Sequence, residues 1–344
     1  MIDICKRIYS ALEDPKIYRT RGNTGLYPSQ ASVELKNGKL AGGCHRQVYY
    51  QWKDIKPTNK GETDFSLSAE YGTWLHEGLV KFLNNHVIAT DLIVLSEEHS
   101  FFDKELLLSG RTDVFLMDKN SDEIFGVEAK SVGKFSGKMC LTQPKIEHIL
   151  QALVYLDQYR STSKQGHRSI DYWVLLYMAR DEDWDFKARK HGSVFRYMWQ
   201  FWVTIEDDHA VVHCQNGTRT SYPEITISGI KKRYKELRDH LCKDNLPERD
   251  YELQYSEEWI TSLYKSGELR FKKDNEAVAK WLAKGAKPDK LNLKMGDHQC
   301  MFCPWSTLCW SEIPDAEVKN DRILFSLEEL HRPDETEKSA DIII

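Results

Sequence analysis

Hydrophobic and polar positions follow two different periods along this chain, and their order predicts an α/β fold. Apolar residues recur at helical spacing over about 66–85 and 142–159. Pro144 lies in the first turn of the second segment, where a helix tolerates proline. Alternating or continuous apolar runs predict strands at 90–96, 104–118, 123–130, 171–179, 195–205 and 209–214. The order helix, three strands, helix, strand indicates a core built on a mixed sheet.

The remaining segments are predicted to surround this core as helices and loops. Further helices are expected at 1–17, 44–52, 224–242, 256–266 and 275–285. Residues 18–43 are rich in Gly, Asn and Ser, residues 53–65 are polar, and both segments are typical of loops. Residues 311–344 are expected to form a loosely packed acidic extension.

Composition favours an intracellular protein of one large domain or two smaller ones. The chain has 344 residues, of which 41% are hydrophobic. Its mean hydropathy is −0.57, and it contains no long apolar run or secretory signal, so we expect it in the cytoplasm and not in a membrane. In that compartment, its eight cysteines are expected to be reduced thiols or metal ligands.

Charge is unevenly distributed and does not exclude a nucleic-acid partner. The net charge is −5, but residues 311–344 carry ten acidic and four basic side chains, which leaves the rest of the chain at +1. A local basic groove is sufficient for a nuclease. Candidates are KARK at 187–190 and KKRYKELR at 231–238. A solvated helix or loop face is the alternative interpretation of both.

Three cysteines crowd the run CMFCPWSTLC, with the spacing C-x2-C-x5-C at Cys300, Cys303 and Cys309. Cys44, far upstream, is a candidate for the fourth ligand. Tetrahedral zinc and iron–sulfur clusters both take four thiolates, and the spacing leaves both open. A site that includes Cys44 would close the chain between its ligands into a loop. The other cysteines, predicted to be ordinary buried thiols, are Cys5, Cys140, Cys214 and Cys242.

Two adjacent predicted strands carry acidic residues and a lysine. Asp113 lies in GRTDVFL, and Glu128 and Lys130 lie in GVEAK. Because side chains alternate along a strand, Glu128 and Lys130 point to the same face, and strand pairing would bring Asp113 beside Glu128. Two carboxylates suit Mg²⁺ or Mn²⁺, and the lysine can orient an attacking water. A solvated strand edge is the alternative.

The helices on either side of these strands add polar side chains. His76 shares the inward, apolar face of its helix, where it is a metal ligand or a satisfied core histidine. His148, Gln151 and Tyr155 lie on one stripe of the later helix. Gln151 and Tyr155 can hydrogen-bond a phosphate or Lys130. The stripe is otherwise the polar face of an amphipathic helix.

Taken together, these motifs resemble the PD-(D/E)XK nuclease superfamily, in its RecB/AddB-like branch with a 4Fe–4S cluster. That branch includes CRISPR-associated adaptation exonucleases. The matching pieces are GTWLHEG, GRTD, VEAK, HILQALVYL, Cys44 followed by HRQVYY, and CMFCPWSTLC, which cover about 44–160 and 298–310. Thr112 stands where the family name places proline. Residues 180–297 match no motif and are interpreted as an insertion that grips DNA or a partner.

The resemblance implies a restriction-endonuclease-like mixed sheet flanked by helices, in a single domain over 1–310 whose ends are tied by the cluster. It implies that Mg²⁺ or Mn²⁺ is held by His76, Asp113, Glu128 and the carbonyl of Ala129. It implies catalytic roles for Asp113, Glu128, Lys130, Gln151 and Tyr155, in which Lys130 orients the water and the last two position DNA or Lys130. The implied ligands of the 4Fe–4S cluster are Cys44, Cys300, Cys303 and Cys309.

The activity implied is that of a metal-dependent DNA exonuclease that hydrolyses phosphodiester bonds on single strands or at DNA ends. The setting would be recombination, repair or mobile-element processing in a bacterial or phage-infected cell, with a helicase, integrase or recombination protein as a possible partner. One alternative is a CRISPR-type nuclease that trims DNA for integration. The other is a non-catalytic nucleic-acid-binding module with a structural zinc.

Overall fold

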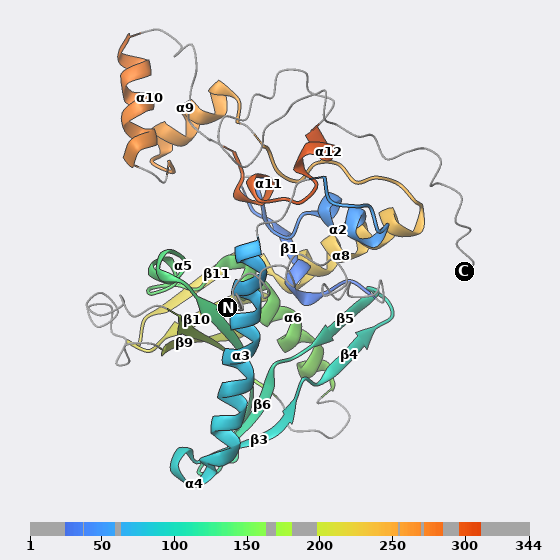
Figure 1. The fold of residues 1–344 in the computed structure, drawn as a ribbon, viewed down its shortest axis with the longest axis vertical. Helices are drawn as coiled ribbons and strands as arrows, with labels where there is room; N and C mark the ends of the chain where they lie inside the picture. Colours follow the sequence, from blue (N-terminus) through green and yellow to red (C-terminus); the bar gives the residue numbers. More distant parts are fainter. Residues whose placement is uncertain are drawn as a thin grey trace, which may run out of the picture. The chain divides into compact units, whose positions relative to one another are not determined.

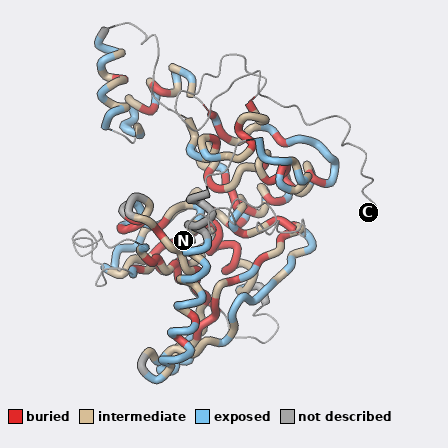
Figure 2. The backbone as a smooth tube through the Cα atoms, viewed as in Figure 1, coloured by how far each residue is buried: buried red, intermediate tan, exposed pale blue. Residues whose placement is uncertain are grey.

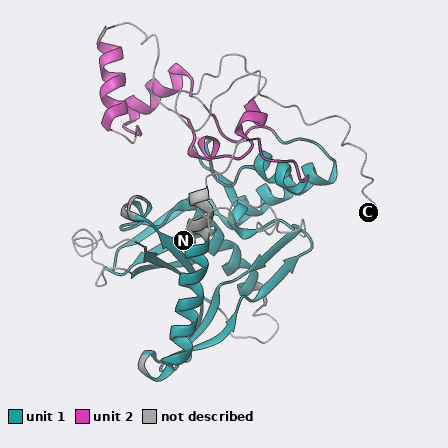
Figure 3. Ribbon diagram, in the orientation of Figure 1, with its two compact units in different colours: residues 1–52, 62–247 teal, residues 53–61, 248–344 magenta. Residues whose placement is uncertain are grey.

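The computed structural model describes residues 25–36, 38–58, 63–162, 170–180, 198–253, 255–269, 272–284 and 296–310. The chain divides into two compact units (Figure 3). The first unit comprises 1–52 and 62–247, and the second comprises 53–61 and 248–344. Each unit is described by itself below. This division concerns compactness, so a single nuclease domain over 1–310 stays a prediction. The expected helix at 1–17 and the acidic extension from 311 lie outside the described residues.

A seven-stranded mixed sheet forms the centre of the first unit, which confirms the predicted α/β class (Figure 1). Its strand order is β11-β10-β9-β8-β7-β6-β3. The bounds are β3 (Leu92–Glu97), β6 (Val114–Asp118), β7 (Ile124–Val132), β8 (Trp173–Ala179), β9 (Met198–Glu206), β10 (His209–Cys214) and β11 (Arg219–Thr226). Only β7 and β8 run parallel; the other neighbouring pairs in this sheet are antiparallel.

The predicted strand at 104–118 is wrong, because the chain turns there. β4 (Ser100–Asp103) and β5 (Leu108–Arg111) form a separate two-stranded sheet, and β6 begins only at Val114. Asp103 Oδ1 accepts hydrogen bonds from the backbone N–H groups of Glu105 and Leu106, which fixes the turn between β4 and β5. The polypeptide therefore changes sheets around Thr112, directly before Asp113.

Several short strands were not predicted. The expected loop at 18–43 contains η1 (Pro28–Gln30), β1 (Ser32–Glu34) and β2 (Leu40–Gly42). β11 was missed because it contains Pro223, which cannot donate a ladder hydrogen bond and is tolerated only because β11 is an edge strand. β9 to β11 belong to the main sheet, and the interpretation of 180–297 as an insertion that grips DNA or a partner stays a prediction.

Helices cover both faces of the sheet. α3 (Thr63–Asn85) lays Val80 and Leu83 on one face, and the short α4 (Val87–Thr90) follows it. The strand residues beneath α3 are Val114, Leu116, Val127 and Val174. α6 (Ile146–Thr162) covers the opposite face, and Figure 2 shows buried positions concentrated in α6 and the strands. α5 (Lys134–Met139) lies in the segment that connects β7 to α6.

An aromatic stack lies between α6 and the sheet. Tyr155 stacks on Trp173 with ring centroids 4.9 Å apart, and Tyr159 meets Phe115 edge-on at 4.8 Å. Trp173 is fully buried, and Gly126 on the neighbouring strand leaves room for its ring. Large aromatic rings therefore fix the distance between α6 and β7, the two elements that carry most of the predicted site.

α8 (Ile227–Cys242) packs against α2 (His45–Trp52), α6 and β1 through a buried stripe of Ile230, Tyr234, Leu237 and Leu241. Its basic run is paired with acidic side chains. Lys231 contacts Asp157 at 2.7 Å, and Lys235 contacts Glu105 at 2.6 Å. These ion pairs favour a solvated helix face for the 231–238 run, and a basic groove there stays a prediction. The run at 187–190 lies outside the described residues.

The second unit contains α9 (Glu257–Ser266), α10 (Lys272–Lys284), α11 (His298–Met301) and α12 (Ser306–Trp310). α9 begins at the N-cap Ser256 and ends at Gly267 in the left-handed conformation, so both of its ends follow from local sequence signals. Ile260 and Val278 join α9 to α10. None of the described helices combines the length and apolarity that crossing a bilayer requires.

Candidate active site

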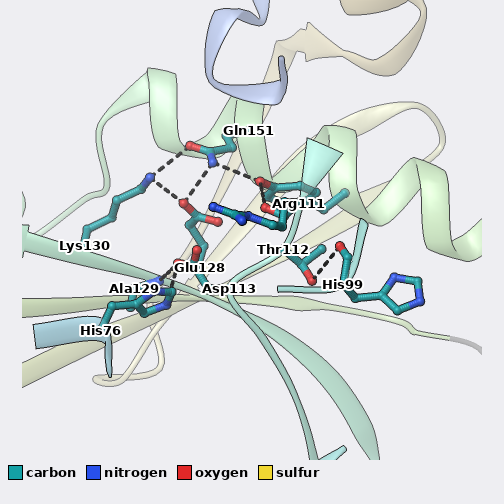
Figure 4. Close-up of polar contacts among 10 residues, drawn as sticks. His76, His99, Arg111, Thr112, Asp113, Glu128, Ala129, Lys130 and Gln151 are labelled. Atoms are coloured by element: carbon teal, nitrogen blue, oxygen red, sulfur yellow. Dashed lines mark hydrogen bonds and ion pairs between the residues drawn. The ribbon is translucent and has the colours of Figure 1, made fainter. Parts of the chain in front are cut away.

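Asp113 lies beside Glu128, as the predicted strand pairing requires. Val114 pairs with Val127, so the next pair outward in this antiparallel hairpin is Asp113 and Glu128. Asp113 Oδ2 accepts a hydrogen bond from the Ala129 N–H at 2.8 Å. His76 Nε2 of α3 lies 3.2 Å from the same oxygen (Figure 4). Residues from α3, β7 and the start of β6 therefore converge on one carboxylate.

Glu128, Lys130 and Gln151 form a closed triangle of contacts. Lys130 Nζ lies 2.6 Å from Glu128 Oε1 and 2.9 Å from Gln151 Oε1. Gln151 Nε2 donates to the same Glu128 oxygen at 2.8 Å. Glu128 is only 4% exposed, and its second oxygen, Oε2, has no hydrogen-bond partner among the described residues. A buried carboxylate oxygen left open in this way is costly unless it serves a ligand.

Tyr155 connects the Gln151 corner of this triangle to the backbone of β5. Its hydroxyl accepts a hydrogen bond from Gln151 Nε2 at 3.2 Å and donates to the Arg111 carbonyl at 3.0 Å. Gln151 thereby uses its amide N–H groups on Glu128 and Tyr155, which fixes the direction of its carbonyl towards Lys130. The contacts of Gln151 and Tyr155 thus match the positioning of Lys130, one of the two roles expected for them.

Burial and neighbouring charges shift the pKa values of Glu128 and His76. Burial raises the pKa of the Glu128 carboxyl to about 7, with Lys130 opposing the rise and Asp113 adding to it. The Asp113 carboxylate raises the pKa of His76, and burial partly offsets this. Perturbed groups that neighbour one another in this way are characteristic of functional sites.

His148 lies on α6 with Gln151 and Tyr155, and its ring contacts Tyr177 of β8. Its Nδ1 lies 2.7 Å from the Tyr177 hydroxyl. Burial lowers the pKa of His148 well below its usual value, and the charges of Lys130 and Lys145 act in the same direction. His148 therefore belongs to the packing behind the site.

The donors present are those that Mg²⁺ and Mn²⁺ accept, although they are engaged with protein groups. Within the ranges that the structure covers, no three His, Cys, Asp or Glu side chains are arranged to hold a metal ion. Asp113 accepts a hydrogen bond from the Ala129 N–H, and Glu128 accepts one from Lys130. The open Oε2 of Glu128 beside Asp113 fits a hard cation. The role expected of the Ala129 carbonyl stays a prediction.

The three clustered cysteines lie on α11, the following turn and α12. Burial raises the pKa of the Cys303 thiol to about 11, and Cys309 is near enough to add to the rise. Arg249 donates two hydrogen bonds to the Cys309 carbonyl, at 2.6 and 3.1 Å, and its guanidinium lies 4.5 Å from the Trp310 ring centroid. None of these three cysteines forms a disulfide, and Cys44 lies directly before α2 of the first unit. Thiolates are the ligands that zinc and iron–sulfur clusters take, and a metal bound by these cysteines stays a prediction.

The other cysteines differ in burial from the prediction. Cys140 is fully buried, as predicted, Cys214 is half-buried, and Cys242 is exposed at the end of α8. The prediction of a buried thiol is therefore wrong for Cys242, because its helix ends at the surface. Cys5 lies outside the described residues.

No family model matches this chain, and no curated protein matches it in sequence. The interpretation of the site therefore rests on its geometry. Sequence reasoning missed the link from Tyr155 to the Arg111 carbonyl and the stacking of Tyr155 on Trp173, because both join elements that are distant in the chain.

Proposed function

We propose that the chain is a metal-dependent nuclease with a restriction-endonuclease-like core of the PD-(D/E)XK type. The observation that carries this is the buried Glu128, whose Oε1 is held by Lys130 and Gln151 while its Oε2 stays open next to Asp113. A buried carboxylate oxygen without a partner is costly in a purely structural role. An arrangement that immobilises one oxygen and leaves the other free supports a cation-binding carboxylate.

Each residue has a role that its contacts support. Asp113 and Glu128 would hold Mg²⁺ or Mn²⁺, with His76 and the Ala129 carbonyl as the further ligands. When bound, such a cation would neutralise charge on the phosphodiester and lower the pKa of the attacking water. Lys130 orients that water through Nζ, since its other contacts fix the ammonium group within reach of Glu128.

The substrate is DNA, with single strands or DNA ends preferred, and the biological setting is recombination, repair or mobile-element processing. In the same proposal, Cys44, Cys300, Cys303 and Cys309 bind a 4Fe–4S cluster with a structural role. Anaerobic purification followed by an absorbance spectrum and an iron assay tests the cluster. A colourless protein with stoichiometric zinc would refute the 4Fe–4S cluster.

A cleavage assay tests the activity. Labelled single-stranded, duplex and circular DNA are incubated with Mg²⁺ or Mn²⁺ and the full chain. Lys130→Met is expected to lower the rate at least about a hundredfold, as for the loss of a general acid–base group. Lys119→Met, in the exposed hairpin turn, is the matched control and retains the rate. Binding without cleavage by the wild type would refute the nuclease and favour a non-catalytic module.

A further inference from the structure

Arg111 is an exposed cation next to the candidate active site that the roles above do not use. It ends β5, two residues before Asp113. Along this segment Leu108, Gly110 and Thr112 are buried, whereas Arg111 is exposed. Only Thr112 separates Arg111 from Asp113, and the backbone bends there between the two sheets, so their Cα atoms are at most about 7 Å apart. Figure 4 shows its side chain pointing towards the carboxylates of the site.

The Arg111 backbone is rigidly connected to the catalytic triangle. Its carbonyl accepts the hydrogen bond from Tyr155, and Tyr155 in turn contacts Gln151. On the other side, the Thr112 N–H donates to the His99 carbonyl at 3.0 Å. The position from which the guanidinium extends is therefore fixed relative to Lys130 and Glu128, as a substrate-binding residue requires.

Among the described residues, the guanidinium of Arg111 is paired with one solvent-exposed carboxylate. Arg111 Nη1 lies 3.1 Å from Glu98 Oε2, and the two side chains are 58% and 57% exposed. Exposed ion pairs of this kind contribute little to stability and exchange readily. Glu98 is also near the site, because its N–H donates to the Asp113 carbonyl and its charge helps to raise the pKa of His76.

We propose that Arg111 binds a phosphate of the nucleic-acid substrate beside the scissile bond, and that this phosphate displaces Glu98 from the guanidinium. The planar fork of arginine matches two phosphate oxygens and is more weakly hydrated than an ammonium group. Glu98 occupies the fork when no substrate is bound and competes with it. This inference rests on the proposed nuclease function, since it assigns the substrate phosphate to that site.

Binding is measured without cleavage, by fluorescence anisotropy of a labelled single-stranded oligonucleotide with the full chain in EDTA, over a series of NaCl concentrations. Arg111→Ala is expected to weaken binding about tenfold. It also lowers the slope of log affinity against log salt by about 0.7 to 1, because one phosphate contact is lost. Glu98→Gln is expected to tighten binding about twofold to threefold, because the competing carboxylate is removed.

Arg219→Ala is the matched control. Arg219 forms a similarly exposed pair with Glu206 on β11 and β9, away from the site, so its loss tests for a general charge effect. In the cleavage assay, Arg111→Ala is expected to raise KM about tenfold and to change kcat less than about twofold. Melting temperatures of all variants are compared with that of the wild type to exclude misfolding.

Three results would overturn the inference: unchanged binding and salt slope in Arg111→Ala, equal weakening in Arg219→Ala, or no DNA binding by the wild type. The wild type could bind DNA through Arg111 without cleaving it. That result would support the phosphate site and refute the nuclease function. Failure of Glu98→Gln to tighten binding would overturn the displacement of Glu98.

Discussion

Replacing Gly126 by alanine tests whether the aromatic stack positions the candidate active site. A Cβ on Gly126 would overlap the Trp173 ring and lie 2.5 Å from its Cζ2, about 1 Å inside normal carbon–carbon contact. Trp173 is fully buried and is covered on the other side by Tyr155. A displaced ring disturbs Tyr155, which stacks on it and whose hydroxyl accepts a hydrogen bond from Gln151.

The expected cost combines overpacking, about 1–3 kcal/mol, with the loss of stacking, about 0.5–1.5 kcal/mol. For a unit of this size we expect a fall in Tm of about 5 to 15 °C. Within regular structure, alanine is otherwise more stable than glycine. A loss of stability therefore reports the overlap between the added Cβ and the Trp173 ring, and not a backbone preference. Because Gln151 moves with Tyr155, the cleavage rate is expected to fall about tenfold.

Thermal unfolding followed by circular dichroism, together with the cleavage assay, measures both effects. Gly78→Ala is the control, since Gly78 is exposed within α3 and an added Cβ meets nothing within 4 Å; it is expected to stabilise the helix by about 1 kcal/mol. Adding Trp173→Phe to Gly126→Ala is expected to restore much of the lost stability. A Gly126→Ala protein that melts within about 2 °C of the wild type would refute the reasoning.

Three further changes test other parts of the structure. Tyr155→Phe removes the hydrogen bond to the Arg111 carbonyl and is expected to cost about 1 kcal/mol in urea unfolding and to lower kcat severalfold. Burial lowers the pKa of His45 to about 3, so the unfolded chain takes up the proton first. The contribution of neutral His45 to the free energy of unfolding is therefore fully present above about pH 6.5. It is lost on acidification, by up to about 1.4 kcal/mol per pH unit. Urea unfolding of His45→Gln at several pH values should lack this slope. Cys303→Ser is expected to abolish iron binding and its visible absorbance, whereas Cys242→Ser, at an exposed thiol, should leave both unchanged.

Local sequence patterns predicted much of the fold, because they depend on few residues. Helices with clear periodicity or caps were placed within a few residues, as α9 with Ser256 and Gly267 illustrates. Strands that pair with residues far away in the sequence were not placed as well. β4 is short and half-exposed, and β11 contains Pro223, so neither carries a local strand signal strong enough to predict it.

The site divides in the same way. Alternation along β7 by itself put Glu128 and Lys130 on one face, and helical spacing put Gln151 and Tyr155 on one stripe, because both periodicities are properties of the local backbone. Only the tertiary structure decided that Gln151 bridges Lys130 and Glu128, and that one oxygen of Glu128 stays open. Burial and hydrogen-bond partners arise from packing α6 on the sheet, which depends on residues far apart in the chain.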